Sequence, residues 1–213
     1  MNGTVVPICL RTPSRRDGTF LAIHICNNCR YLIRSTRNKA PTYLLKIMRI
    51  LGIDPGSRLT GYGIIEDSPQ GYKYIASGSI RIKADYFPDR LKQIFDGILE
   101  IVDNYHPEQM AIEQVFMHKN ADSALKLGQA RGAAICAVQT KGLPVFEYAA
   151  RQVKQAVVGK GAADKIQVQH MVKLLLNVQG ALSLDASDAL GISICHVHYQ
   201  QTAIMLGKQG LIR

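Results

Sequence analysis

Residues 50–65 read ILGIDPGSRLTGYGII, and this stretch decides the interpretation of the whole chain. The apolar residues before Asp54 are typical of a buried strand, which Pro55-Gly56 ends. The residues from Gly61 onward start a second strand after a short turn. A carboxylate at the end of a core strand is costly unless it is paired, protonated or bound to a metal ion. The rest of the chain should therefore contain a partner for Asp54.

The bulk composition indicates one globular domain with a small appendage. The chain has 213 residues, of which 47% are hydrophobic, and its formal net charge is +10. Eight Lys and Arg residues and one Asp precede Met48, so most of the positive charge lies in that segment. The charge of the main domain is therefore only a weak indication of a nucleic-acid partner. No apolar stretch is long enough to span a membrane.

The segment 1–47 differs from the rest of the chain. It shows no sustained helical or strand periodicity, whereas a clear strand follows Met48, a second possible start. We interpret 1–47 as a disordered or mis-assigned N-terminal extension and 48–213 as the folded domain with a short C-terminal tail. The five cysteines are odd in number and lack the spacing of a disulfide framework, which favours a reducing, cytoplasmic location. Cys136 lies in a segment of small residues and is expected in the core.

The spacing of turn-forming residues and apolar segments after Met48 predicts strands and helices. Strands are expected at 48–54, 61–66, 72–82, 109–116 and 143–150. Helices are expected at 87–105, 120–141 with Asn120 as N-cap, 150–158, 163–177 and 185–199. This order predicts an α/β fold with a mixed sheet.

Four carboxylates need an explanation, and each has an ordinary one. Asp54 could cap a turn, and Glu113, inside an apolar strand, could pair with an arginine. Asp185 and Asp188 could cap the last helix. Together, however, two acids lie on separate strands facing the core and two open a helix on its inward face. If the strands are adjacent and the helix crosses their ends, all four converge. Such a cluster needs cations, and oxygen ligands select Mg²⁺ or Mn²⁺; two such ions could hydrolyse a phosphodiester.

Several segments resemble one known family. They are LGIDPGSRLTGYGII, AIEQVFMHKNADSALKLGQARG, PVFEYAARQVKQAVVGKGAADKIQVQHMV and DASDALGISICH. In this order they are similar to the RuvC-type Holliday-junction resolvases of bacteria, and the match runs from Met48 to about Tyr199. The segment 1–47 has no counterpart in that family.

The resemblance implies a ribonuclease-H-like fold, with a five-stranded mixed sheet and helices on both faces. It also implies a homodimeric, Mg²⁺-dependent endonuclease that makes paired nicks in strands of like polarity in a four-way DNA junction, beside the RuvA–RuvB branch-migration complex. The catalytic and metal-binding carboxylates of the family fall on Asp54, Glu113, Asp185 and Asp188. Its DNA-stacking aromatic residue falls on Phe116, and its DNA-contacting lysines fall on Lys154 and Lys165.

Further basic residues lie near the same segments. Lys119, Arg131 and Arg151 could contact phosphates, although a solvated surface position is the usual place of such side chains. Phe116 could stack on a base or pack in the core.

Two other functions are considered. An actin-like ATPase or sugar kinase has a similar first strand, Asp and glycine-rich hairpin, but it needs a second such domain. A junction-binding protein without catalysis is the other alternative, and an assay is needed to distinguish it.

Overall fold

The computed structural model describes residues 20–26, 29–35, 45–115 and 120–205, with side chains at 47–115 and 120–204. The chain divides into two compact units. The smaller holds the strands before Met48 and the turn Asp67–Gly71, and the larger holds Arg49–Glu66 and the chain from Tyr72 onward.

The smaller unit contains a β-hairpin. Strand β1 (Phe20–Cys26) pairs antiparallel with β2 (Cys29–Ser35), and Cys26 lies opposite Cys29 where the hairpin closes. Residues 30–32 of β2 then pair antiparallel with residues 45–47, the start of β3 (Leu45–Asp54). The segment 1–47 thus contains two strands, and its assignment as an extension outside the functional domain stays a prediction.

The larger unit is built on five strands. They are β3, β4 (Leu59–Ser68), β5 (Gly71–Arg81), β6 (Gln109–Glu113) and β7 (Val145–Tyr148). Their order across the sheet is β5-β4-β3-β6-β7. The pairs β3–β6 and β6–β7 are parallel, whereas β4 and β5 are joined by a short turn, as antiparallel neighbours are. The predicted α/β fold with a five-stranded mixed sheet is confirmed.

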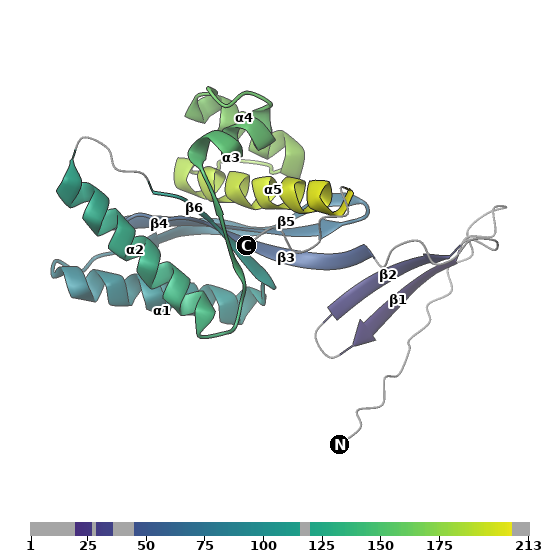
Figure 1. Cartoon of the computed structure of the whole chain (residues 1–213), viewed down its shortest axis with the longest axis horizontal. Coiled ribbons are helices and arrows are strands. Elements are labelled where there is room, and N and C mark those ends of the chain that lie inside the picture. The colour runs from purple at the N-terminus through teal and green to yellow at the C-terminus, as the bar shows by residue number, and fades with distance from the viewer. Residues whose placement is uncertain (1–19, 27–28, 36–44, 116–119, 206–213) are drawn as a thin grey trace, which may run out of the picture. The chain divides into compact units, whose positions relative to one another are not determined.

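Helices cover both faces of this sheet (Figure 1). They are α1 (Phe87–Tyr105), α2 (Ala121–Gln139), α3 (Ala150–Val158), α4 (Lys165–Leu176) and α5 (Leu184–Met205). Helices α1 and α2 lie on one face, and α3, α4 and α5 lie on the other. None of the helices in these described ranges is long and apolar enough to cross a membrane.

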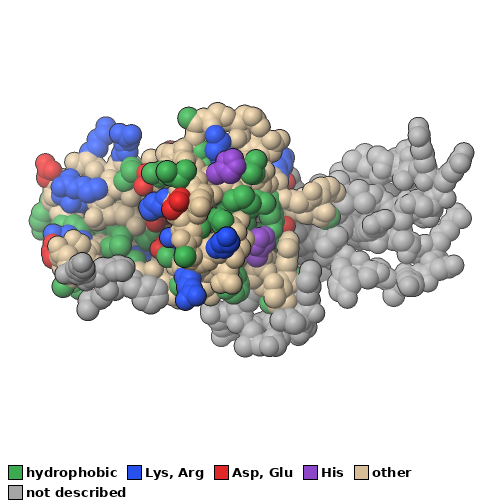
Figure 2. Space-filling view, turned by 90° about the horizontal axis from the view of Figure 1, so that it is seen from above, with side chains coloured by type: hydrophobic (Ala, Val, Ile, Leu, Met, Phe, Trp, Pro, Cys, Tyr) green, Lys and Arg blue, Asp and Glu red, His purple; other side chains and the backbone are tan. Residues whose placement is uncertain are grey.

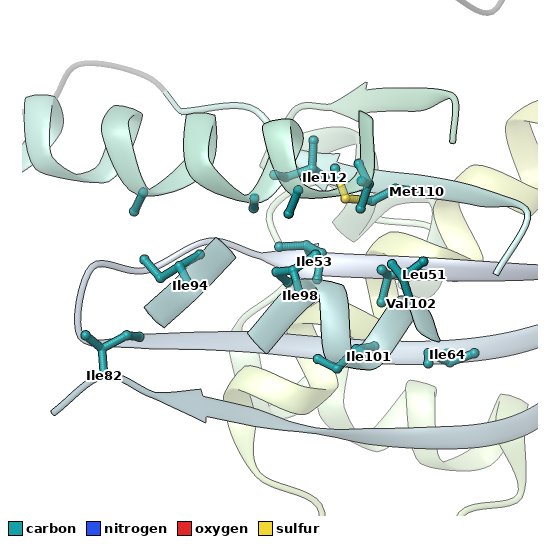
Figure 3. Close-up of a cluster of buried hydrophobic side chains, with 14 residues drawn as sticks. Leu51, Ile53, Ile64, Ile82, Ile94, Ile98, Ile101, Val102, Met110 and Ile112 are labelled. Carbon is teal, nitrogen blue, oxygen red and sulfur yellow. The ribbon is translucent and has the colours of Figure 1, made fainter. Parts of the chain in front are cut away.

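The main core lies between the sheet and the α1–α2 layer. Helix α1 buries Ile94, Ile98 and Val102 at helical spacing, which is the pattern that predicts it. These side chains meet Leu51 and Ile53 of β3 (Figure 3). Because β3 is buried on both faces, its apolar residues form a continuous run.

Several predicted boundaries hold, and others need correction. Helix α1 has the expected bounds, and the Asn120 side chain caps α2 by accepting a hydrogen bond from the Ser123 N–H. Strand β6 ends at Glu113, earlier than expected, and α5 continues to Met205. The expectation that Cys136 lies in the core is wrong, because its position on α2 faces outward and the residue is exposed.

Candidate active site

The ends of two neighbouring strands place two carboxylates side by side. Strand β3 ends at Asp54 and β6 ends at Glu113, and the two strands are parallel. Ile53 is paired with Ile112, so each acid follows directly on a paired residue. The turn after β3 is held by Thr60, whose hydroxyl donates to the Gly56 carbonyl at 2.8 Å. Thr60 therefore makes the hydrogen bond that stabilises this turn. The Asp54 carboxylate is not needed to cap the turn.

Helix α5 lies directly on the backbone of β3 and β4, because glycines face it. A Cβ atom added to Gly61 would lie 2.3 Å from the Asp185 carbonyl oxygen. Added to Gly52, it would lie 2.1 Å from the Ala189 carbonyl oxygen. Any side chain at these positions would push α5 away from the sheet. The glycines thus bring the first turns of α5, with their two acids, against the strands.

The first turn of α5 is capped by a serine and not by the acids. The Ser183 hydroxyl accepts a hydrogen bond from the Ala186 N–H at 3.3 Å. Asp185 and Asp188 are three residues apart and share one side of the helix. Ser183 therefore caps α5, and the alternative that Asp185 and Asp188 cap this helix is wrong.

The other three acids act electrostatically on Asp54. Its pKa is raised from 3.8 to about 7, mainly by burial and then by the charges of Glu113, Asp188 and Asp185, in that order. Burial also raises the pKa of Glu113, and the Asp188 charge adds to it. Like charges that share one site raise each other's pKa in this way. The sequence-predicted carboxylates thus belong to one electrostatic cluster.

One lysine supplies a positive charge inside this cluster. The Lys165 ammonium donates to Asp188 Oδ2 at 3.0 Å, and this hydrogen bond raises the pKa of Lys165. The Lys165 charge lowers the pKa of Asp54 and of Glu113, against the effect of burial. Lys154 on α3 also lowers the pKa of Glu113. Both predicted DNA-binding lysines therefore lie close enough to act on the carboxylates.

The arginine nearest the Glu113 backbone pairs with another acid. The Arg131 guanidinium forms an ion pair with Glu147 at 2.5 Å. Its Nε donates to the backbone carbonyl of Glu113 at 3.3 Å, so it holds the strand end and leaves the carboxylate free of an arginine. The simple Arg–Glu113 pair considered from the sequence is absent from the described residues.

A buried histidine on α5 connects this helix to strands β6 and β7. His196 is fully buried, and its Nδ1 lies 2.7 Å from the Tyr148 hydroxyl while its Nε2 lies 2.6 Å from Gln109 Oε1. The Gln109 oxygen can only accept, so Nε2 carries the proton and the Tyr148 hydroxyl donates to Nδ1. Burial lowers the pKa of His196 to about 4, which keeps it neutral. Tyr148 pairs with Glu113 across β6 and β7, so this contact supports the strand end that carries the acid.

The donor set fits a hard divalent cation. All four acids offer oxygen ligands, their mutual repulsion favours a bound cation, and the nearby Lys165 ammonium already contributes a positive charge. As the side chains stand, however, no group of three or more His, Cys, Asp and Glu residues in the described part of the chain is arranged so that it could hold a metal ion. The Asp188 carboxylate is turned to Lys165, so a cation must join or replace that ammonium.

Three of the predicted DNA-contacting residues remain to be placed. Phe116 and Lys119 lie outside the described residues. Arg151 is exposed on the first turn of α3, where its side chain lies close to Gly161. On the face that carries α3, α4 and α5, Lys and Arg side chains are spread out, with Asp and Glu between them (Figure 2). No single basic block therefore marks the site on this face among the described residues.

The comparisons with known proteins identify one family. Residues 50–196 match the family model for crossover junction endodeoxyribonuclease RuvC. The chain is 66% identical over 160 residues to the crossover junction endodeoxyribonuclease RuvC of Methylococcus capsulatus, a match that covers 75% of this chain and 96% of that protein. It is 61% identical over 158 residues to that of Dichelobacter nodosus, covering 74% and 90%.

Solved structures give the same result. The Thermus thermophilus RuvC in complex with a Holliday junction substrate has a TM-score of 0.68 and 29% identity, covering 76% of this chain and 97% of that one. A second Thermus thermophilus RuvC structure has a TM-score of 0.67 and 30% identity, covering 73% and 97%. The chain belongs to the RuvC family of crossover junction endodeoxyribonucleases.

Proposed function

We propose that this chain resolves four-way DNA junctions by paired symmetric nicks in strands of like polarity, in recombination and repair. The observation that supports the proposal is the electrostatic effect of Glu113, Asp188 and Asp185 on the buried Asp54, in a member of this family. In each nick a water oxygen is added to phosphorus and one P–O bond of the DNA strand breaks. The Thermus thermophilus relative, solved with a Holliday junction substrate, supports the choice of substrate.

The chain's own residues prepare this reaction. Asp54 and Glu113 are fixed by paired strands, and Asp185 is fixed by the contact of α5 with Gly61. The four acids would hold the metal, which when bound neutralises the phosphate charge and makes a water molecule more acidic. Lys165 balances the excess negative charge when the site is loaded with DNA phosphate. Strand ends and a helix on backbone contacts give these groups little freedom to move.

The metal is proposed as Mg²⁺, with two ions per subunit and Mn²⁺ as a possible substitute. Carboxylate oxygens alone suit both ions, because neither requires nitrogen or sulfur ligands. Four acids offer enough oxygen atoms for two ions that share ligands.

For DNA contacts we propose the six residues that the sequence points to, which are Lys154, Lys165, Lys119, Arg131, Arg151 and Phe116. The coupling of Lys154 and Lys165 to the carboxylates supports the first two. Arg131 and Glu147 line a cavity of about 370 Å³ that also contacts Gln114, the residue after Glu113.

A homodimer is proposed because a four-way junction offers two equivalent strands to a two-fold pair of sites. The outward face of α2 supports this helix as the interface. Leu125 is 66% exposed, and Cβ atoms added to Gly128 or Gly132 would meet nothing within 4 Å. A second copy could approach this face closely.

Light scattering tests the dimer. Gly132→Lys places a charge on the proposed interface and should shift the protein toward monomer, whereas Asn104→Lys adds the same charge to an exposed position on α1 and should not. A parent protein that is monomeric at micromolar concentration and still makes paired nicks would contradict this proposal.

Three further points follow from the proposed activity. Cooperation with a RuvA–RuvB branch-migration complex and a cytoplasmic location are expected for a bacterial junction resolvase. The nuclease domain is proposed to be 48–213, with 1–47 dispensable. A protein starting at Met48 should then cleave junctions as the full chain does.

The decisive experiment is cleavage of a labelled synthetic four-way junction, with linear duplex of the same sequence as the control. We expect symmetric nicks in the junction only, with Mg²⁺ and not with chelator. Asp54→Asn should abolish cleavage and retain binding. Tight junction binding without nicking in any divalent metal would instead indicate a binding protein without catalysis.

A further inference from the structure

Ile166 is the most exposed of the large hydrophobic side chains in the described residues. It is 73% exposed, in the first turn of α4. Single exposed apolar residues are common on protein surfaces. The position of this one is unusual, because it follows Lys165, whose ammonium bonds to Asp188 in the carboxylate cluster.

The geometry of α4 turns Ile166 away from the protein. Val168, Val172 and Leu176 are the buried residues of this helix, so they define its inward side. Ile166 precedes Val168 by two residues, a rotation of about 200° at 3.6 residues per turn, so it points to the outside. The helix end beneath it is fixed, because Asp164 and Gln167 cap each other reciprocally.

The charges around Ile166 favour a nucleic acid over a protein as its partner. Lys165 precedes it, and both Lys165 and Lys154 act electrostatically on the acids. Because Lys165 in the first turn of α4 bonds to Asp188, a strand whose phosphate is bound at the carboxylates would lie beside this turn. An apolar side chain there would contact the part of the nucleotide that carries no charge, namely the deoxyribose and the base.

We propose that Ile166 is a DNA-positioning residue that packs on the deoxyribose and base of a nucleotide next to the cleaved phosphate. This inference rests on the proposed function. The lysines bind phosphates without defining where along the strand the protein sits, whereas an apolar contact with one nucleotide defines its position. The contact would thus help to fix which phosphate faces the four acids.

The test compares two serine substitutions on the same helix. Ile166→Ser removes the proposed contact. Leu174→Ser is the matched control, because Leu174 is 61% exposed and lies two turns further along, about 12 Å from Ile166 at 1.5 Å per residue. Ile166→Leu keeps an apolar side chain and should behave as the parent. Junction Kd is measured in chelator at several salt concentrations, and kcat and KM are measured with Mg²⁺.

We expect Ile166→Ser to raise the junction Kd about fivefold to tenfold, with Leu174→Ser unchanged. The factor should be the same at every salt concentration, because an apolar contact releases no counterions, whereas Lys154→Ala should reduce the salt slope. The cut of Ile166→Ser should also spread to neighbouring phosphates.

Equal Kd values and one unchanged cut position for parent and Ile166→Ser would overturn the inference. So would equal losses in both serine variants, or a change of oligomeric state in Ile166→Ser alone, which would assign the residue to a protein contact. A parent protein that neither binds nor cuts junctions would be a failure of the proposed function instead. The two failures are therefore distinguishable.

Discussion

The Lys165 ammonium lies 3.0 Å from Asp188 Oδ2, so a cationic side chain and a carboxylate of the site are already in contact. The same lysine lowers the pKa of Asp54 and Glu113. One flexible charge on α4 thus compensates acids that come from two strands and another helix. The Lys165 charge thus offsets part of the repulsion among the acids.

Lys165→Ala should reduce junction cleavage on the order of 100-fold, because both the charge balance and a phosphate contact are lost. Lys126→Ala is the control, because Lys126 forms an exposed pair with Asp122 on α2. Single-turnover cleavage and thermal unfolding of both variants check this. Equal activity of the two variants would contradict a role for Lys165 in the site.

Asp54→Asn should stabilise the metal-free protein at pH 8. The pKa of Asp54 is raised from 3.8 to about 7, so its ionisation destabilises the fold as the pH rises through about 7. The variant lacks this charge and should gain on the order of 2–4 kcal/mol at pH 8 and little at pH 4. Urea unfolding in chelator at both pH values measures the difference.

Asp96→Asn is the control for this change, because Asp96 is exposed and pairs with Lys92. It should show no comparable dependence on pH. Adding Mg²⁺ should stabilise the parent more than Asp54→Asn, since the ion binds the folded carboxylate cluster. Equal Mg²⁺ effects would mean that Asp54 is not a ligand.

Gly61→Ala should destabilise the protein by a few kcal/mol and lower cleavage more than binding. The added Cβ would lie 2.3 Å from the Asp185 carbonyl, so α5 and its acids must shift away from β4. Asn104→Ala, at an exposed position on α1, is the control and should change the free energy of unfolding by less than about 0.5 kcal/mol. Chemical unfolding and the rate of junction cleavage check both; a fully active Gly61→Ala would refute the contact.

Tyr148→Phe should lower the free energy of unfolding by about 1–3 kcal/mol, because the buried Nδ1 of His196 loses its hydrogen-bond donor.

The pKa of His196 is lowered from 6.5 to about 4. Its contribution to stability is therefore present above pH 6.5 and is lost as the pH falls toward 4, opposite in sign to that of Asp54. The parent should lose stability over this range relative to His196→Gln, as urea unfolding at pH 7 and pH 5 would show.

The sequence predicts most elements because they carry strong periodic signals. The apolar residues of α1 and the run before Asp54 are examples, and both lie in the core. The four acids could be identified because each interrupts an apolar pattern. Their ordinary alternatives could be rejected only in three dimensions, since Thr60 and Ser183 make the expected turn and cap contacts.

Other features depend on contacts between distant segments. The roles of Gly52 and Gly61 require knowledge that α5 crosses their strands, although glycines inside apolar strands are themselves a signal of close approach. Arg131 on α2 pairs with Glu147 on β7 and not with Glu113, and such a pairing between distant segments cannot be read from the sequence. Cys136 was misplaced because small residues on a helix do not show which side faces the core.

The glycine contacts between α5 and the sheet also bear on the entropy of ligand binding. No side chain lies between Gly61 and the backbone of Asp185, so the strand and the helix move together as one body. A cation that enters the site then has to order only the carboxylate torsions and the Lys165 side chain. The conformational entropy lost on binding stays small, and more of the interaction energy remains for affinity.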